Sequence, residues 1–205
     1  MAGRPRGVGD DVILRAAAEV IGRDGPAGFT LAAVAGEVGL VPGTLVQRFG
    51  SKRGLLLALA ERSARDAGDL ADRVRADHGS ALAALTALAV STTGALDSPD
   101  RYANHLAFLC ADLVDPELHA HALAVHQAQG AAYLQLLAEA VAAGDLRAGT
   151  DPVALAATVH TVVAGAGLTW ALDREGTLAR RLERELAAVL APHTEARTTQ
   201  REDDV

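Results

Sequence analysis

The sequence is short of several residue types, and each shortage excludes a class of protein. Cys110 is the one cysteine among 205 residues, so no internal disulfide can form, and this fits a reducing compartment. Six residues are aromatic, so alanine and leucine must build the core, which favours helices over sheets. Nucleophile elbow, phosphate-loop and zinc-protease motifs are missing. We therefore predict an all-α protein that is not an enzyme and uses no cofactor.

Targeting signals are missing too. No apolar run follows Met1, so no signal peptide is expected. The longest apolar segment, residues 153–172, is interrupted by His160, glycines and threonines, and a buried helix explains it better than a membrane span. One lysine stands against 18 arginines, which is typical of a GC-rich genome and indicates a bacterial source. We predict a cytoplasmic protein with no membrane partner.

Charge is unevenly divided along the chain. The formal net charge is -7, yet residues 1–53 carry seven basic side chains against five acids. Phosphate attraction is local and is screened beyond about 8 to 10 Å at ordinary salt. A basic N-terminal part on an acidic remainder is therefore compatible with DNA binding. Arg4 and Arg6 lie in a Gly/Pro-rich arm that either reaches a minor groove or is a disordered terminus.

The most informative stretch lies between residues 30 and 53. Thr30 can cap a helix over 30–38, Gly39 can supply the left-handed residue that ends it, and Pro42 suits the first turn of a helix over 42–49. Two short helices joined by a glycine-containing turn predict a helix-turn-helix, whose second helix enters the major groove of DNA.

This stretch resembles the N-terminal domain of the tetracycline-repressor (TetR) family over about residues 10 to 60. The resemblance rests on Gly43-Thr44-Leu45 followed by Phe49, Ser51 and Lys52, on Gly39 and Thr30 before them, and on Ile13, Leu14 and the alanines at 16 to 18. The family usually has Ser, Tyr and His or Tyr where this chain has Val41, Val46 and Arg48. The resemblance implies a homodimeric repressor of transcription that a small molecule releases from a palindromic operator.

In such a motif the exposed face of the second helix meets base edges, and helix starts hold phosphates. Gln47 is predicted to pair with an adenine edge, and Leu45 and Phe49 to pack inward. Thr30 and Lys52 are predicted to contact phosphate. The candidate DNA-binding residues are Thr30, Pro42, Gly43, Thr44, Val46, Gln47, Arg48 and Lys52. The alternative for each is an ordinary solvated surface position.

Caps and prolines divide the rest of the chain into helices. We expect a first helix over 10–23 with Asp10 or Asp11 as its cap, a long fourth helix from 51 toward 77, and further helices over 80–96, 99–113, 116–143, 152–173 and 177–191. The predicted domains are a three-helix helix-turn-helix domain (1–52), a helical effector-binding and dimerisation domain (53–193) and a disordered tail (194–205).

Gln129 interrupts the apolar stripe of the helix over 116–143, and a polar group there needs a partner. That partner is either a small ligand, since the resemblance implies an inducer cavity among the central helices, or a neighbouring helix. The candidate ligand-binding residues are Tyr102, His105, Phe108, His126, Gln129, Tyr133, His160 and Trp170. The abundance of alanine, leucine and valine predicts a largely apolar effector. The spacing of His119, His121 and His126 does not suit a helical metal site, so no metal is predicted.

The last two helices carry apolar residues at steps of three and four, with small residues between them. Two such hairpins from two chains could form a four-helix bundle, which is where the resembled family dimerises. The candidate interface residues are Leu155, Val162, Gly165, Leu182 and Leu186. The alternative is that both helices are satisfied within one chain. The rival to a regulator is a helical ligand-binding or structural dimer without specific DNA binding, which Val41 and Val46 leave open.

Overall fold

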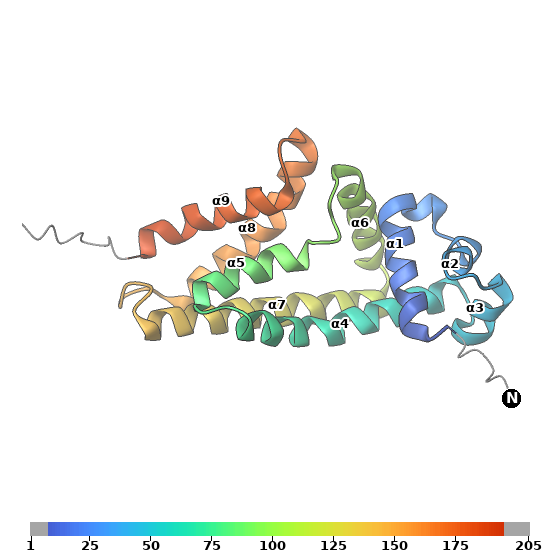
Figure 1. Ribbon diagram of the computed structural model, residues 1–205, viewed down its shortest axis with the longest axis horizontal. Coiled ribbons are helices and arrows are strands. Elements are labelled where there is room, and N and C mark those ends of the chain that lie inside the picture. The colour runs from blue at the N-terminus through green and yellow to red at the C-terminus, as the bar shows by residue number, and fades with distance from the viewer. Residues whose placement is uncertain (1–7, 195–205) are drawn as a thin grey trace, which may run out of the picture.

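The computed structural model describes residues 8–194, and this part of the chain is entirely helical (Figure 1). The predicted all-α fold is confirmed. The elements are α1 (Asp10–Gly28), α2 (Leu31–Glu37), α3 (Pro42–Phe49), α4 (Lys52–Ala76), α5 (Ala81–Thr92), α6 (Pro99–Asp112), α7 (Pro116–Ala143), α8 (Pro152–Asp173), α9 (Leu178–Leu190) and the short 3-10 helix η1 (Ala191–His193). The predicted arm with Arg4 and Arg6 and nearly all of the predicted tail lie outside the described residues.

Most helices begin where a side-chain cap predicts. Thr30 Oγ1 accepts a hydrogen bond from Ala33 N, and Ser51 Oγ accepts one from Gly54 N, each at 3.0 Å. Three expectations were wrong. The first helix does not end at Arg23 but continues to Gly28, with a kink at Gly25. The cap of α1 is Gly9, which has no side chain to offer. Helix α5 ends at Thr92 instead of 96, and the Thr92 hydroxyl donates to the Ala89 carbonyl, one of the carbonyls near the helix end.

The helices form two parts, a head made of α1, α2 and α3 and a body made of α5 to α9, and α4 leads from the head into the body. Figure 1 shows α1, α2 and α3 gathered at one end, α4 and α7 running side by side from this head along the molecule, and α8 and α9 paired on the opposite side. The head core contains Ile13, Val20, Phe29, Val34 and Leu45. A separate core in the body is built mainly from α5, α7 and α8.

Packing continues from the head into the body. Leu55 of α4 and Phe108 of α6 belong to the head core, and the Phe108 ring lies edge-on to Phe29 with 5.5 Å between ring centroids. Asn104 Nδ2 of α6 donates to the Gly22 carbonyl of α1 at 2.8 Å. The predicted domain boundary at residue 52 therefore divides the sequence, but side chains on both sides of it pack into one core.

Helix α8 departs from the expected buried helix. It is long and apolar enough to cross a membrane, by length and composition alone, but only 33% of its most apolar window is buried. Its outer face exposes Val153, Leu168 and Leu172 by 62%, 47% and 77%. The helix thus carries an apolar face that this chain leaves uncovered.

Candidate DNA-binding surface and ligand cavity

The turn between α2 and α3 has the geometry that the sequence predicts. Gly39 has φ +65°, a backbone conformation that residues other than glycine rarely adopt. Leu40 N donates to the Ala35 carbonyl at 2.9 Å and so closes the end of α2. Leu45 is fully buried and Phe49 is half-buried, so both point into the head core. The opposite side of α3 is therefore the side that this packing leaves free.

That outer side of α3 presents most of the predicted base-reading residues. Pro42, Gly43, Val46 and Gln47 are exposed, and Thr44 is half-buried. Val41 precedes α3 without a side-chain cap bond, as its apolar side chain requires. The chain thus offers one amide, one hydroxyl and one apolar side chain to a neighbouring surface, which is the mixture that reads base edges in a major groove.

Thr30 and Lys52 lie at the starts of α2 and α4 and are both exposed. The Thr30 hydroxyl oxygen is occupied by its capping bond, while its hydrogen stays free to donate to a phosphate. The Lys52 Nζ atom lies 5.3 Å from the centroid of the Phe29 ring, so the ring orients the ammonium group without neutralising it.

Arg48 is placed differently from the other candidates. Its Nη1 donates to the Val8 carbonyl at 2.6 Å and to Asp10 Oδ1 at 3.1 Å, which ties the end of α3 to the start of α1. A contact between Arg48 and DNA would require these bonds to break. Sequence reasoning could not anticipate this, because the partners are about forty residues away.

Ion pairs occupy other basic side chains of the head. Arg23 pairs with Glu37 at 2.7 Å, and Arg53 pairs with Asp115 at 3.0 Å and with Glu117 at 2.7 Å. Among the described residues up to 53, Arg15 and Lys52 are the basic side chains without an ion pair. The positive charge available to phosphate is therefore smaller than the sequence count suggests, and Lys52 is the basic side chain at a helix start that is free to supply it.

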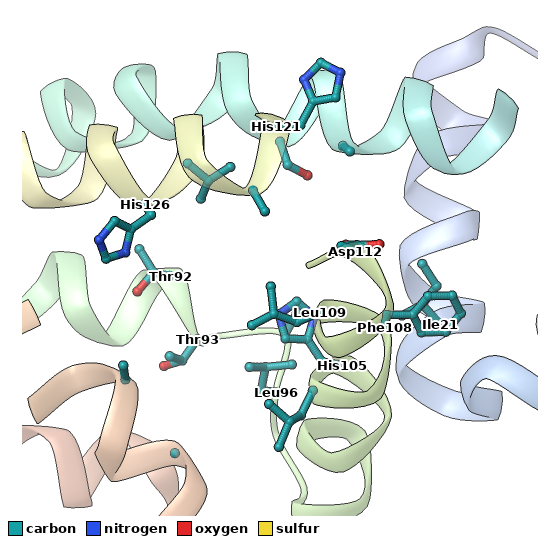
Figure 2. Close-up of a pocket in the computed structure, with 18 of the residues that line it drawn as sticks. Ile21, Thr92, Thr93, Leu96, His105, Phe108, Leu109, Asp112, His121 and His126 are labelled. Atoms are coloured by element: carbon teal, nitrogen blue, oxygen red, sulfur yellow. The ribbon is translucent and has the colours of Figure 1, made fainter. Parts of the chain in front are cut away.

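A cavity of about 780 Å³ lies between the head and the body (Figure 2). Its wall includes Ile21 of α1 and Leu56 of α4 as well as residues of α5, α6, α7 and α8. Six of the eight predicted ligand-binding residues line it: Tyr102, His105, Phe108, His126, Gln129 and His160. Gln129 forms no hydrogen bond to another helix within residues 8–194, so its amide is available to the cavity. Whether a ligand uses these side chains stays a prediction.

Tyr133 and Trp170 do not line the cavity, which corrects their selection as ligand-binding residues. Tyr133 is fully buried in the body core, where its hydroxyl has no hydrogen bond within the described chain, and burial raises its pKa to about 12. Trp170 is 2% exposed, and its Nε1 donates to the Gly176 carbonyl at 3.1 Å. Both are large rings that the core needs for packing, a role that composition cannot separate from ligand binding.

The cavity wall carries several histidines, of which His105 and His126 are exposed and His160 is half-buried. The rings of His126 and His160 stack with 4.2 Å between centroids. Burial, followed by the influence of His126, lowers the pKa of His160, and burial lowers that of His105. No three His, Cys, Asp or Glu side chains in the described part of the chain are grouped to hold a metal ion.

Asp112 also lines the cavity, and sequence reasoning missed it. It lies on the same face of α6 as Tyr102, His105 and Leu109, at steps of three and four, so helical periodicity could have found it. Burial, with a smaller effect from Asp115, raises its pKa.

The predicted dimer interface needs correction. Leu155, Leu182 and Leu186 are 4%, 0% and 1% exposed and pack inside the chain, so they have no surface left for a partner. Val162 is half-buried, and Gly165 is exposed. The strong periodicity of these leucines reflects the body core, and the free apolar face of α8 lies on its other side.

Known proteins share this architecture. The family model described as bacterial regulatory proteins, tetR family, matches residues 13–59. A regulator from Saccharomonospora viridis, solved in complex with choline, is 18% identical with a TM-score of 0.74, over 91% of this chain and 98% of that one. SmeT, the repressor of the Stenotrophomonas maltophilia multidrug efflux pump SmeDEF, is 21% identical with a TM-score of 0.65, over 92% of each chain.

FadR from Bacillus subtilis, solved in complex with stearoyl-CoA, is 20% identical with a TM-score of 0.63, over 88% of this chain and 97% of that one. No curated protein sequence gives a match. At these identities the solved structures establish a shared fold, while the family model bears on the head.

Proposed function

We propose that this chain, which belongs to the TetR family of bacterial regulatory proteins, is a DNA-binding transcriptional regulator that responds to a small molecule. The observation that carries the proposal is the helix-turn-helix over residues 31–49, whose α3 buries Leu45 and exposes Gln47 and Val46. We assign base reading to Thr44, Val46 and Gln47, and phosphate contact to Thr30 and Lys52. The family expectation of a repressor, and of action in the cytoplasm, belongs to the same proposal.

The regulator would act as a homodimer joined through the outer face of α8. Thr161, Gly165, Leu168 and Leu172 recur at steps of four, three and four, and all are exposed, with Leu168 also lining the edge of the cavity. A Cβ added at Gly165 would meet nothing within 4 Å, which leaves room for the close approach of a second helix. A second copy would cover the apolar face of α8 and would explain that face without a membrane.

Release from DNA would follow from where the cavity lies. Ile21 of α1 and Leu56 of α4 form part of its wall, so a molecule inside it contacts the head directly. A ligand that prefers one arrangement of α1 against α6 shifts the population toward that arrangement, and two heads that no longer match the half-site spacing bind DNA less tightly. The cavity wall is mostly apolar, which supports a largely apolar effector.

Selection of DNA fragments from the source genome tests this proposal. The purified protein should enrich fragments that share a two-fold symmetric site, with half-sites about one helical turn apart or a multiple of it. The Gln47→Ala variant should enrich a site with one relaxed base position in each half. Enrichment without a shared sequence would favour the rival, a helical ligand-binding dimer without specific DNA binding.

A further inference from the structure

Within residues 8–194, the cavity wall carries two formally charged side chains other than histidine, Arg101 and Asp112. The charge of Arg101 is compensated by neighbouring acids: its guanidinium donates to Glu19 at 2.8 Å and to the Ala95 carbonyl at 3.1 Å, and it lies 3.4 Å from Asp97. The Asp112 carboxylate has neither a hydrogen bond nor an ion pair with any residue of the described chain. The wall therefore presents one uncompensated charge, and it is negative.

The position of Asp112 strengthens this negative potential. Asp112 is the last residue of α6, and the carboxyl end of a helix carries partial negative charge from its unpaired carbonyl groups. Figure 2 shows Asp112 at this end of the helix, with His105 and Leu109 on the same wall. Burial raises the pKa of Asp112, which is the expected response of a carboxylate that lacks a counter-charge.

Apolar side chains dominate the rest of the wall. Leu109 and Leu113 flank Asp112 on the cavity side of α6, and alanine, leucine and valine make up most of the remaining wall. Phe108 packs into the head core and Tyr102 lies ten residues before Asp112 on α6, so neither ring is placed beside the carboxylate. One carboxylate in an apolar wall favours an apolar molecule with one positive charge.

We propose that the cavity binds an amphipathic monovalent cation, a molecule with an apolar body and a single ammonium group, with Asp112 as the counter-charge. This proposal rests on the proposed function for its regulatory meaning, while binding itself can be measured without DNA. It narrows the expected ligand from largely apolar to apolar and cationic.

Histidines on the wall would favour an anionic ligand over a cationic one only if their rings were protonated. Burial lowers the pKa of His105 and of His160, which keeps these two rings neutral at pH 7. Neutral imidazoles accept contact with a cation and do not repel it. A measurement at pH 8 keeps histidine side chains in general uncharged and leaves Asp112 to decide.

The test compares three probes with the same chain length by titration calorimetry at pH 8: decyltrimethylammonium, decanol and decanoate, each below its micelle concentration. The full-length protein should bind decyltrimethylammonium about 10- to 100-fold more tightly than the other two, the factor that one close opposite charge supplies. In the Asp112→Asn variant this preference should vanish while decanol binds as before. The Asp69→Asn variant, which removes an exposed carboxylate outside the cavity, should keep the preference.

Equal or tighter binding of decanol or decanoate to the unmodified protein would overturn the proposal, even if Asp112→Asn failed to fold. So would an unchanged preference in a folded Asp112→Asn variant. Neither result would affect the regulator proposal, which depends on recovery of a shared operator sequence. Conversely, selective cation binding by a protein that enriches no shared sequence would refute the regulator and leave the cation site standing.

Discussion

The head and the cavity differ in how far apart along the chain their residues lie. The head core is drawn from residues 13–55, with Phe108 as its one distant member, whereas the cavity wall is drawn from residues between 18 and 168. Helix caps, a left-handed glycine and short periodic helices organise the head locally. The cavity forms only when six helices meet, so its residues follow from the tertiary arrangement. Substitutions in the two regions should therefore fail in different ways.

The largest expected effect is in the body core. Leu186→Asp should unfold the protein, because it buries an unpaired charge at a position that is 1% exposed, at a cost of about 4 kcal/mol or more. Thermal melting followed by circular dichroism measures the loss. The adjacent exposed position supplies the control, and Ala187→Asp should remain folded. A folded but monomeric Leu186→Asp protein would return Leu186 to the dimer interface.

A charge on the outer face of α8 should dissociate the proposed dimer without unfolding the chain. Gly165→Asp places a charge on an exposed face and should leave the chain folded but monomeric, because a close helix contact cannot hold a desolvated charge. Operator affinity should fall about a hundredfold or more, since one head reaches one half-site. Sedimentation gives the mass, with Gly165→Ala as the control for size. An unmodified protein that sediments at 21.1 kDa would refute this interface.

A smaller effect should appear where α6 meets α8. A Cβ at Gly167 would clash with the Tyr102 ring, so Gly167→Ala must displace that ring and should destabilise the fold by about 1 to 3 kcal/mol. Gly68 on α4 is the matched control, because a Cβ there meets nothing within 4 Å. Gly68→Ala should stabilise the helix by about 0.5 to 1 kcal/mol. Urea denaturation distinguishes the two, and equal changes would contradict the packing of Tyr102 on α8.

The smallest expected effect depends on pH. A backbone hydrogen bond from Glu175 and the Arg181 guanidinium lower the pKa of Asp173, so the folded chain binds a proton there less readily than the unfolded chain. This contribution is fully present above the unfolded value of about 3.9 and is lost as the pH falls through the lower folded value. The melting temperature of Asp173→Asn should be lower than that of the unmodified protein at pH 6. The difference should shrink below about pH 4, and a constant difference would show that the charge of Asp173 is not involved.

The sequence alone predicts the number and order of the helices and most of the residues on the exposed face of α3. The starts of α7 and α8 match the prediction, because Asp115-Pro116 and Asp151-Pro152 each place a cap before a helix-starting proline. The end of α7 follows from Gly144, which adopts the left-handed conformation there. The inward positions Leu45 and Phe49 followed from helical spacing alone. These features depend on neighbours within a few residues, where propensity and capping act.

The errors came from contacts between distant segments. The apolar period of α9 marks the face that packs on the body, so Leu182 and Leu186, which were predicted to lie in a dimer interface, are buried within this chain. Arg48 was predicted to contact DNA, but it bonds Val8 and Asp10, about forty residues away along the chain. Asp112 was overlooked because the wall it shares with His126 and Gln129 exists only after α6 and α7 pack.

Hydroxyl-radical footprinting of the protein on a selected genomic fragment tests the central claim most directly. We expect two equivalent protected patches related by two-fold symmetry, with centres about one helical turn apart or a multiple of it. Replacing Gln47 with Ala should cost about 1 to 3 kcal/mol and relax one base position in each patch, while replacing Lys52 with Ala should weaken binding to all sequences alike. A single patch, or equal sequence-independent losses for both variants, would contradict a two-headed regulator that reads DNA through α3.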